Sequence, residues 1–150
     1  METASPKPKA IGSVDLPGIR ESVSRARSEV RAWLGADHPA IDDVVLAVSE
    51  LVTNAIRHSD SACRDFIGLT VAATNEIIYV HVNDPGSLLS GPHVRKEVDA
   101  EDGRGLLIVR EISLEWGTRE HGHGLGRTVW CAIPAIPLFD DPPAPESPFK

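Results

Sequence analysis

Cysteine is scarce in this sequence, with only Cys63 and Cys131 among 150 residues. A disulfide framework is therefore not indicated, although the two thiols could still meet if both lie in strands. No apolar run reaches the ~20 residues that a membrane-spanning helix needs. The first ten residues, METASPKPKA, lack the apolar segment of a secretory signal. We therefore expect a soluble cytoplasmic protein.

Basic residues are outnumbered by acidic ones, 15 against 22, which gives a formal net charge of −7. This balance argues against a protein that binds nucleic acid through a basic surface. An acidic surface can still steer a protein partner that has a basic face. Hydrophobic residues make up 41% of the chain, and its length suits one domain with a packed core.

A first amphipathic helix is expected within residues 15–35. Asp15 can cap it, Pro17 can lie in its first turn, and Gly35 can end it. Its apolar stripe recurs every three or four residues and consists of Ile19, Val23, Ala26, Val30 and Leu34. The stretch IGSV, residues 11–14, can form a short edge strand.

A second helix should open at Asp37 or Pro39 and run to about Arg57. Its apolar arc is wide enough for deep burial and consists of Ile41, Val44, Val45, Val48, Leu51, Val52, Ala55 and Ile56. Polar residues nevertheless recur at every fourth position, along one line of this helix: Glu50, Asn54 and His58. Each buried polar group in that row must find a partner.

Two hairpins and a third helix are expected in the rest of the chain. The strands are residues 66–74, 76–84, 114–120 and 126–134, and the helix is residues 106–113. Residues 84–105 carry few structure signals, and a loop of this length is usually functional. The order of elements predicts an α/β (α+β) two-layer sandwich, with helices on one face of a mainly antiparallel, mixed sheet.

The two ends of the chain have few core residues. Residues 1–13 are expected to be a disordered N-terminus, and residues 136–150 a Pro-rich tail. Residues 14–135 should then form the single domain.

The polar row on the second helix could serve a nucleotide. Mg²⁺ takes oxygen ligands and needs few protein groups when phosphates supply the rest, so the amide oxygen of Asn54 suits it. Glu50, one turn earlier, could orient or deprotonate a hydroxyl or water that attacks a γ-phosphate. The alternative is that Asn54 caps a neighbouring loop and that Glu50 is a solvated helix residue.

The stretch VNDPG, residues 82–86, follows an expected strand. Asp84 can accept a hydrogen bond from an exocyclic amine such as that of adenine. Gly86 lets the backbone approach a ring closely. Asp-Pro-Gly is also an ordinary turn sequence, and that alternative stays open.

The stretch EDGRGLLIV, residues 101–109, leads into the third helix. Gly103 and Gly105 form a glycine-rich entry whose backbone N–H groups and helix dipole would favour phosphate. Arg104 adds a cation between them. The motif is neither G-x-G-x-x-G nor a Walker A loop, and a plain helix entry is the alternative.

The last strand holds Thr128 among apolar residues, where its hydroxyl needs a partner. A bound base, or a water on that base, could be this partner, and a neighbouring strand is the alternative. Just before it, HGHG, residues 121–124, lacks the remaining ligands of a recognisable zinc spacing. A glycine-rich hairpin loop is expected there instead.

Taken in order, the four motifs resemble those of the GHKL-type ATPase domain shared by histidine kinases and gyrase. They read SELVTNAIRH, VNDPG, GRGLLIVREISLEWG and GRTVW. The likeness covers nearly the whole chain, and it is closest to the stand-alone bacterial anti-sigma factor/serine-protein kinases, abundant in actinomycetes. The resemblance implies a Bergerat or GHKL-like fold that binds ATP and Mg²⁺.

The resemblance also implies roles for matching positions. By it, Asn54 ligates Mg²⁺, Glu50 is the catalytic base, and Asp84 recognises the adenine amine. The segment that contacts the phosphates corresponds to Gly103, Arg104, Gly105 and Leu106. Thr128 matches a strand threonine near the adenine. His58 matches a common family position, but a satisfied helix-end histidine is expected there.

Two departures from the family's pattern bear on activity. Leu88 stands where the D-x-G-x-G adenine motif has its last glycine, so close backbone approach is lost there. The stretch 87–102 is also short for a lid. Both features favour a non-catalytic or degenerate nucleotide-binding module, whereas the intact Glu50 favours an anti-sigma factor that phosphorylates a serine on an antagonist. The implied partners are a sigma factor and/or an anti-sigma antagonist, and the chain could form a homodimer.

Overall fold

The computed structural model describes residues 7–58, 66–84, 100–121 and 126–136, with the backbone alone at 58 and 100–104. Its elements are β1 (Lys9–Pro17), α1 (Ser22–Leu34), α2 (Ile41–His58), β2 (Phe66–Ala73), β3 (Ile77–Asp84), α3 (Ala100–Ile112), β4 (Glu115–Glu120) and β5 (Arg127–Pro134). Residues 1–6 and 137–150, most of the two expected loose ends, lie outside this description.

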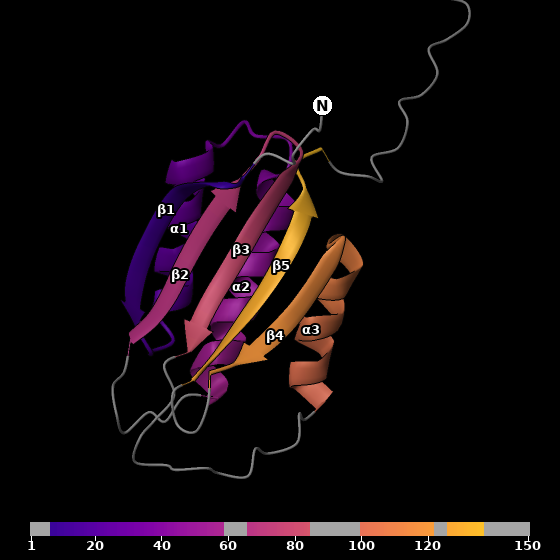
Figure 1. The fold of residues 1–150 in the computed structure, drawn as a ribbon. Coiled ribbons are helices and arrows are strands. Elements are labelled where there is room, and N and C mark those ends of the chain that lie inside the picture. The colour runs from indigo at the N-terminus through magenta and orange to yellow at the C-terminus, as the bar shows by residue number, and fades with distance from the viewer. Residues whose placement is uncertain (1–6, 59–65, 85–99, 122–125, 137–150) are drawn as a thin grey trace, which may run out of the picture.

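The strands form one five-stranded sheet in the order β1-β2-β3-β5-β4. Each of the four pairings between described strands is antiparallel. Figure 1 shows the helices behind this sheet, with α2 crossing behind β3 and β5 and with α3 beside β4. Among the described elements, no helix covers the face toward the viewer, which we call the open face. The predicted two-layer sandwich is therefore confirmed.

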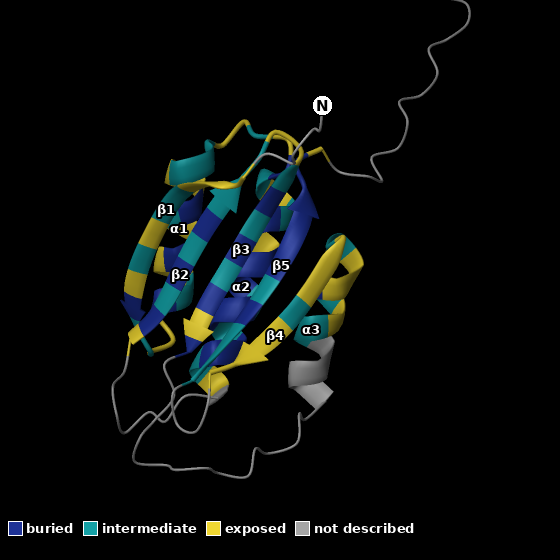
Figure 2. Ribbon diagram, viewed as in Figure 1, coloured by how far each residue is buried: buried dark blue, intermediate teal, exposed yellow. Residues whose placement is uncertain are grey.

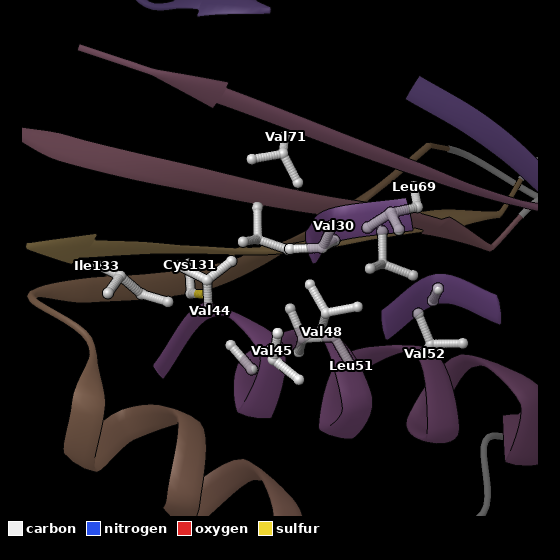
Figure 3. Close-up of a cluster of buried hydrophobic side chains, with 14 of the residues drawn as sticks. Val30, Val44, Val45, Val48, Leu51, Val52, Leu69, Val71, Cys131 and Ile133 are labelled. Carbon is white, nitrogen blue, oxygen red and sulfur yellow. The ribbon is translucent and has the colours of Figure 1, made fainter. Parts of the chain in front are cut away.

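The core lies between α2 and the sheet. Alternate residues of β3, namely Ile78, Val80 and Val82, are buried, and they pair across β5 with buried Ile133, Cys131 and Val129. From the other side, α2 contributes fully buried Val44, Val48, Leu51 and Val52. Figure 2 shows the buried residues of these strands and of α2, and Figure 3 shows the α2 side chains pointing toward those of the strands. The wide apolar arc predicted for the second helix thus packs as expected.

Cys131 is a free, buried thiol at the centre of this layer. Burial raises the pKa of the Cys131 thiol to about 12, which keeps it protonated at neutral pH. A protonated, inaccessible thiol is a poor nucleophile and metal ligand. Cys63 lies outside the described residues.

The first helix begins later than predicted. Asp15 and Pro17 belong to the edge strand β1, whose last residues pair with the start of β2, so neither caps or opens the helix. Proline is tolerated there because an edge strand leaves some N–H groups unpaired. The helix begins at Ser22, whose hydroxyl donates to the Pro17 carbonyl at 2.5 Å. Ile19, placed on the apolar stripe, is instead 50% exposed, and Gly35 ends the helix as predicted.

The edge strand is longer than the four residues predicted, and it begins inside the stretch 1–13 that was expected to be disordered. Its pairing with β2 runs from Lys9 to Pro17. Gly12 allows α1 to pack on it, because the indole of Trp33 lies directly over the glycine. A Cβ added to Gly12 would lie 2.0 Å from Cδ2 of that indole.

We expect Gly12→Ala to destabilise the fold. The added methyl group must displace the Trp33 ring, and overpacking of this kind costs about 1–3 kcal/mol in the free energy of unfolding. Urea denaturation of the wild type and the variant measures the effect.

Gly68→Ala is the matched control, since its added Cβ would meet nothing closer than 3.6 Å. This second variant should be neutral or slightly stabilising, because alanine has less backbone freedom to lose than glycine. Equal effects of the two substitutions would contradict the packing argument.

The open face carries His81 of β3, which is half-buried. Burial, and secondly the charge of Arg119, lower the pKa of His81 below its ordinary 6.5. The folded state therefore holds this proton less tightly than the unfolded state does. As the pH falls below 6.5 toward the folded-state pKa, stability should fall.

We expect His81→Gln to weaken this pH dependence. Urea denaturation at several pH values should show that the wild type loses more stability than the variant as the pH falls below 6.5. Arg119→Gln should reduce the dependence partially, because it removes the second cause of the shift. Parallel pH profiles for all three proteins would show that His81 does not titrate differently on folding.

Candidate functional site

The two flanks of α2 differ in how their buried polar residues are satisfied. On the α1 side, the Ser49 hydroxyl donates to the Val45 carbonyl at 2.8 Å and accepts from Arg27 Nε at 2.7 Å. Further along the helix, Asn54 is only 7% exposed, and its Oδ1 is buried with no hydrogen-bond partner. An unpaired buried amide oxygen costs about 1–3 kcal/mol, so it needs an explanation. A polar ligand that is not part of the folded chain would supply one.

Glu50 lies one turn before Asn54 and faces α3. A Cβ built on Gly105 would lie 2.7 Å from Oε1 of Glu50, so the carboxylate rests against the α3 backbone where there is no side chain. This close approach shows that the Glu50–Asn54 row runs along the flank of α2 that meets α3. A carboxylate and an orphan amide oxygen, one turn apart, therefore lie on the same side of the helix.

Asp84 is the last residue of β3 and is 8% exposed. It continues the buried series Ile78, Val80 and Val82, so its side chain lies on the face of the sheet that α2 covers. In Figure 1, the end of β3, the end of α2 and the start of α3 lie at the same, lower end of the molecule. The structure thus brings Asp84 to the end of the layer that also holds Asn54.

The glycine segment differs from the prediction. A loop was expected to reach residue 105, but α3 begins at Ala100, so Gly103, Arg104 and Gly105 are helical. Gly105 packs against Glu50, and Leu106 packs against the hydrophobic core. Nothing more is described for Gly103 and Arg104, and Gly86 and Leu88 lie outside the described residues. Likewise, only the backbone is described for His58, the last residue of α2.

Thr128 is not brought together with Asp84. It pairs with Asn83, so it lies on the open face, opposite to the α2 side. Its hydroxyl donates to Oδ1 of Asn83 and shares a 2.8 Å hydrogen bond with Nε2 of His121. The neighbouring-strand alternative is therefore the one that the structure supports for Thr128.

The residue opposite Asp84 is Arg127, which sequence reasoning did not single out. Arg127 directly precedes Thr128 in β5. Because successive strand residues point to opposite faces of the sheet, only one of these two side chains can point toward α2. The alternating apolar residues Val129, Cys131 and Ile133, which are buried, could have indicated that it is Arg127, because these odd-numbered positions of β5 lie on the same face as Arg127.

The described residues fit Mg²⁺ only in part. Asn54 Oδ1 and the Glu50 carboxylate are hard oxygen donors of the kind that this ion prefers. Within the described ranges, no group of three or more His, Cys, Asp and Glu side chains could hold a metal. Of HGHG, only His121 is described, and its ring is hydrogen-bonded to the Thr128 hydroxyl. The strands on either side of this stretch, β4 and β5, pair as the predicted hairpin.

Comparison with models of protein families gives a match over most of the chain. None of the curated proteins matches the chain. In the part of the chain that the structure describes, no helix is both long and apolar enough to cross a membrane. The sequence model of the histidine kinase-like ATPase domain matches residues 16–132, which extend from β1 into β5 and include the described helices α1, α2 and α3. By this match over most of its length, the chain belongs to the histidine kinase-like ATPase domain family.

Proposed function

We propose that this chain is an ATP- and Mg²⁺-binding regulatory protein that acts as an anti-sigma factor and phosphorylates a serine on an antagonist protein. Membership of an ATPase domain family supports nucleotide binding. The observation that carries the proposal is the buried, unpartnered Oδ1 of Asn54, one turn from Glu50. A metal-bound triphosphate is a ligand that would satisfy this oxygen.

The roles follow from the chemistry of each side chain. Asn54 would hold Mg²⁺ through Oδ1, and Asp84 would accept a hydrogen bond from the adenine amine. Glu50 would accept the proton of the attacking serine hydroxyl. The serine oxygen then forms a bond to the γ-phosphorus while the bond between the γ-phosphorus and the bridging oxygen of ADP breaks. ATP supplies the phosphoryl group. Arg104 and the backbone of Gly103 and Gly105 would contact the phosphates.

The contact between Glu50 and α3 sets a condition for this function. Oε1 of Glu50 rests against Gly105, so contact between this oxygen and a bound ligand requires the carboxylate to turn or the α3 backbone to move away from α2. Movement of α3 relative to α2 would then be one way to govern access to the site.

A second candidate function is a nucleotide-binding interaction module that transfers no phosphate. Leu88 in place of the motif's last glycine favours it. So does Thr128, whose hydroxyl is engaged on the open face rather than beside Asp84. In this case nucleotide binding alone would change the protein contacts.

The proposed partners are a sigma factor and an anti-sigma antagonist, and the chain could act as a homodimer. The net charge of −7 is compatible with a partner that has a basic face. A cytoplasmic location and the single domain over residues 14–135 stay predictions.

Two measurements test these proposals in order. Calorimetry with Mg·ATP tests binding, and incubation with γ-labelled ATP and purified candidate antagonists tests transfer. Binding with transfer to a serine supports the kinase. Binding without transfer to any candidate supports the interaction module, and absence of binding at millimolar Mg·ATP rejects both.

A further inference from the structure

Arg127 and Asp84 are directly opposite each other in the antiparallel pair of β3 and β5. The next pair inward on the same face, Val82 with Val129, is buried beneath α2. Side chains directly opposite in such a pair point to the same face, with Cβ atoms about 4.5–5.5 Å apart. An arginine and an aspartate are thus side by side at the end of the layer between the sheet and α2.

The two side chains are chemically complementary. Ionised aspartate only accepts hydrogen bonds, and a guanidinium only donates them. Asp84 is 8% exposed, and Arg127 is half-buried, so neither is a freely solvated surface charge. Each already takes part in an interaction within the chain, so a ligand here would share or exchange these partners.

Adenine presents the matching pattern. Its exocyclic amine donates, while the ring nitrogens on either side of that amine, N1 and N7, accept. A carboxylate beside a guanidinium can therefore read the amine and one adjacent nitrogen together. Such a fork gives geometric specificity that a carboxylate alone does not.

We propose that Arg127 is a second base-recognition residue, which donates to N1 or N7 of adenine while Asp84 accepts from the amine. This inference rests on the proposed function, because it specifies how the same site recognises its nucleotide. On its other side, Arg127 is directly opposite Glu120 of β4, so the guanidinium lies between two carboxylates, and the proposal concerns its contact with the base beside Asp84.

Calorimetry of Mg·ATP with wild type and Arg127→Gln tests the proposal. Loss of a charged hydrogen bond should weaken ATP binding by about 10- to 100-fold. Arg119→Gln is the matched control, because Arg119 pairs with Thr128 on the opposite face of the sheet. The control should bind ATP as the wild type does.

Deaza analogues locate the contact. Either 7-deaza-ATP or 1-deaza-ATP should bind the wild type more weakly than ATP does, and Arg127→Gln should show no further loss with that analogue. Arg127→Lys keeps the charge but not the planar fork, so it should fold and bind ATP with intermediate affinity. It serves as the test if the glutamine variant fails to fold.

Three outcomes would overturn the proposal. Unchanged or tighter ATP binding by Arg127→Gln would mean that the arginine only pairs with Asp84 and withholds it from the base. If each deaza analogue weakens binding to Arg127→Gln by the same factor as it weakens binding to the wild type, Arg127 does not contact N1 or N7 of the base. Absence of ATP binding by the wild type rejects the proposed function itself and this inference with it.

Discussion

Asn54→Leu should abolish Mg·ATP binding and yet unfold at a temperature no lower than that of the wild type. Leucine has the same number of side-chain non-hydrogen atoms and the same branching as asparagine, but it has no oxygen to bind a cation. In the folded protein without nucleotide, Oδ1 of Asn54 is buried and unpaired, so its removal relieves a cost of about 1–3 kcal/mol. Calorimetry with Mg·ATP and a thermal melt measure the two effects.

Ser49→Ala is the matched control on the same helix. The Ser49 hydroxyl makes two hydrogen bonds, to Val45 and Arg27, so its loss should destabilise the fold by about 1 kcal/mol and leave nucleotide binding unchanged. Opposite signs of the two stability changes would show that the Asn54 oxygen serves a ligand, whereas the Ser49 oxygen serves the fold. Normal ATP affinity in Asn54→Leu, or in Asn54→Ala, would refute the metal role.

Glu50→Gln should retain Mg·ATP binding and lose phosphoryl transfer. The amide keeps the size of the side chain but cannot accept the proton of the serine hydroxyl, and loss of a general base typically lowers the rate 10²–10⁴-fold. Transfer of labelled phosphate to the antagonist, at saturating ATP, measures this effect. Glu111→Gln, on the exposed part of α3, is the control and should transfer at the wild-type rate.

Gly105→Ala approaches the same residue from the other helix. The new methyl group would lie 2.7 Å from Oε1 of Glu50, so the carboxylate must turn away. Because only the end of a flexible side chain has to move, stability should change little, while transfer falls. Undiminished phosphorylation in both variants would remove Glu50 from the mechanism.

The features that could be predicted from the sequence are those with a strong local pattern. The apolar arc of α2 and the alternation of Ile78, Val80 and Val82 in β3 each identified an element and its buried face. The hairpins followed from pairs of such strands. The match of the family model over residues 16–132 confirms the ATPase-domain part of the resemblance.

The errors arose where a distant contact outweighed a local signal. Asp15 and Pro17 look like a helix start, but pairing with β2 draws them into the sheet. Gly103 and Gly105 look like a loop, yet the helix continues through them, and Gly105 provides the close contact with α2. The site role of Thr128 stays a prediction; the pairing register, which the sequence did not reveal, places its hydroxyl against Asn83 and His121 on the open face. No local pattern places Arg127 beside Asp84, since these residues are joined only by the sheet.

The strand order β1-β2-β3-β5-β4 also has a consequence for co-translational folding at the ribosome. β3 pairs with β2 on one side and with β5 on the other, so its second edge has no partner until residues 127–134 have been synthesised. A nascent chain that ends before them exposes a Val- and Ile-rich strand edge, which is prone to pair with other chains. We therefore expect chaperones to protect this edge of β3 late in translation, until β5 has been synthesised and pairs with it.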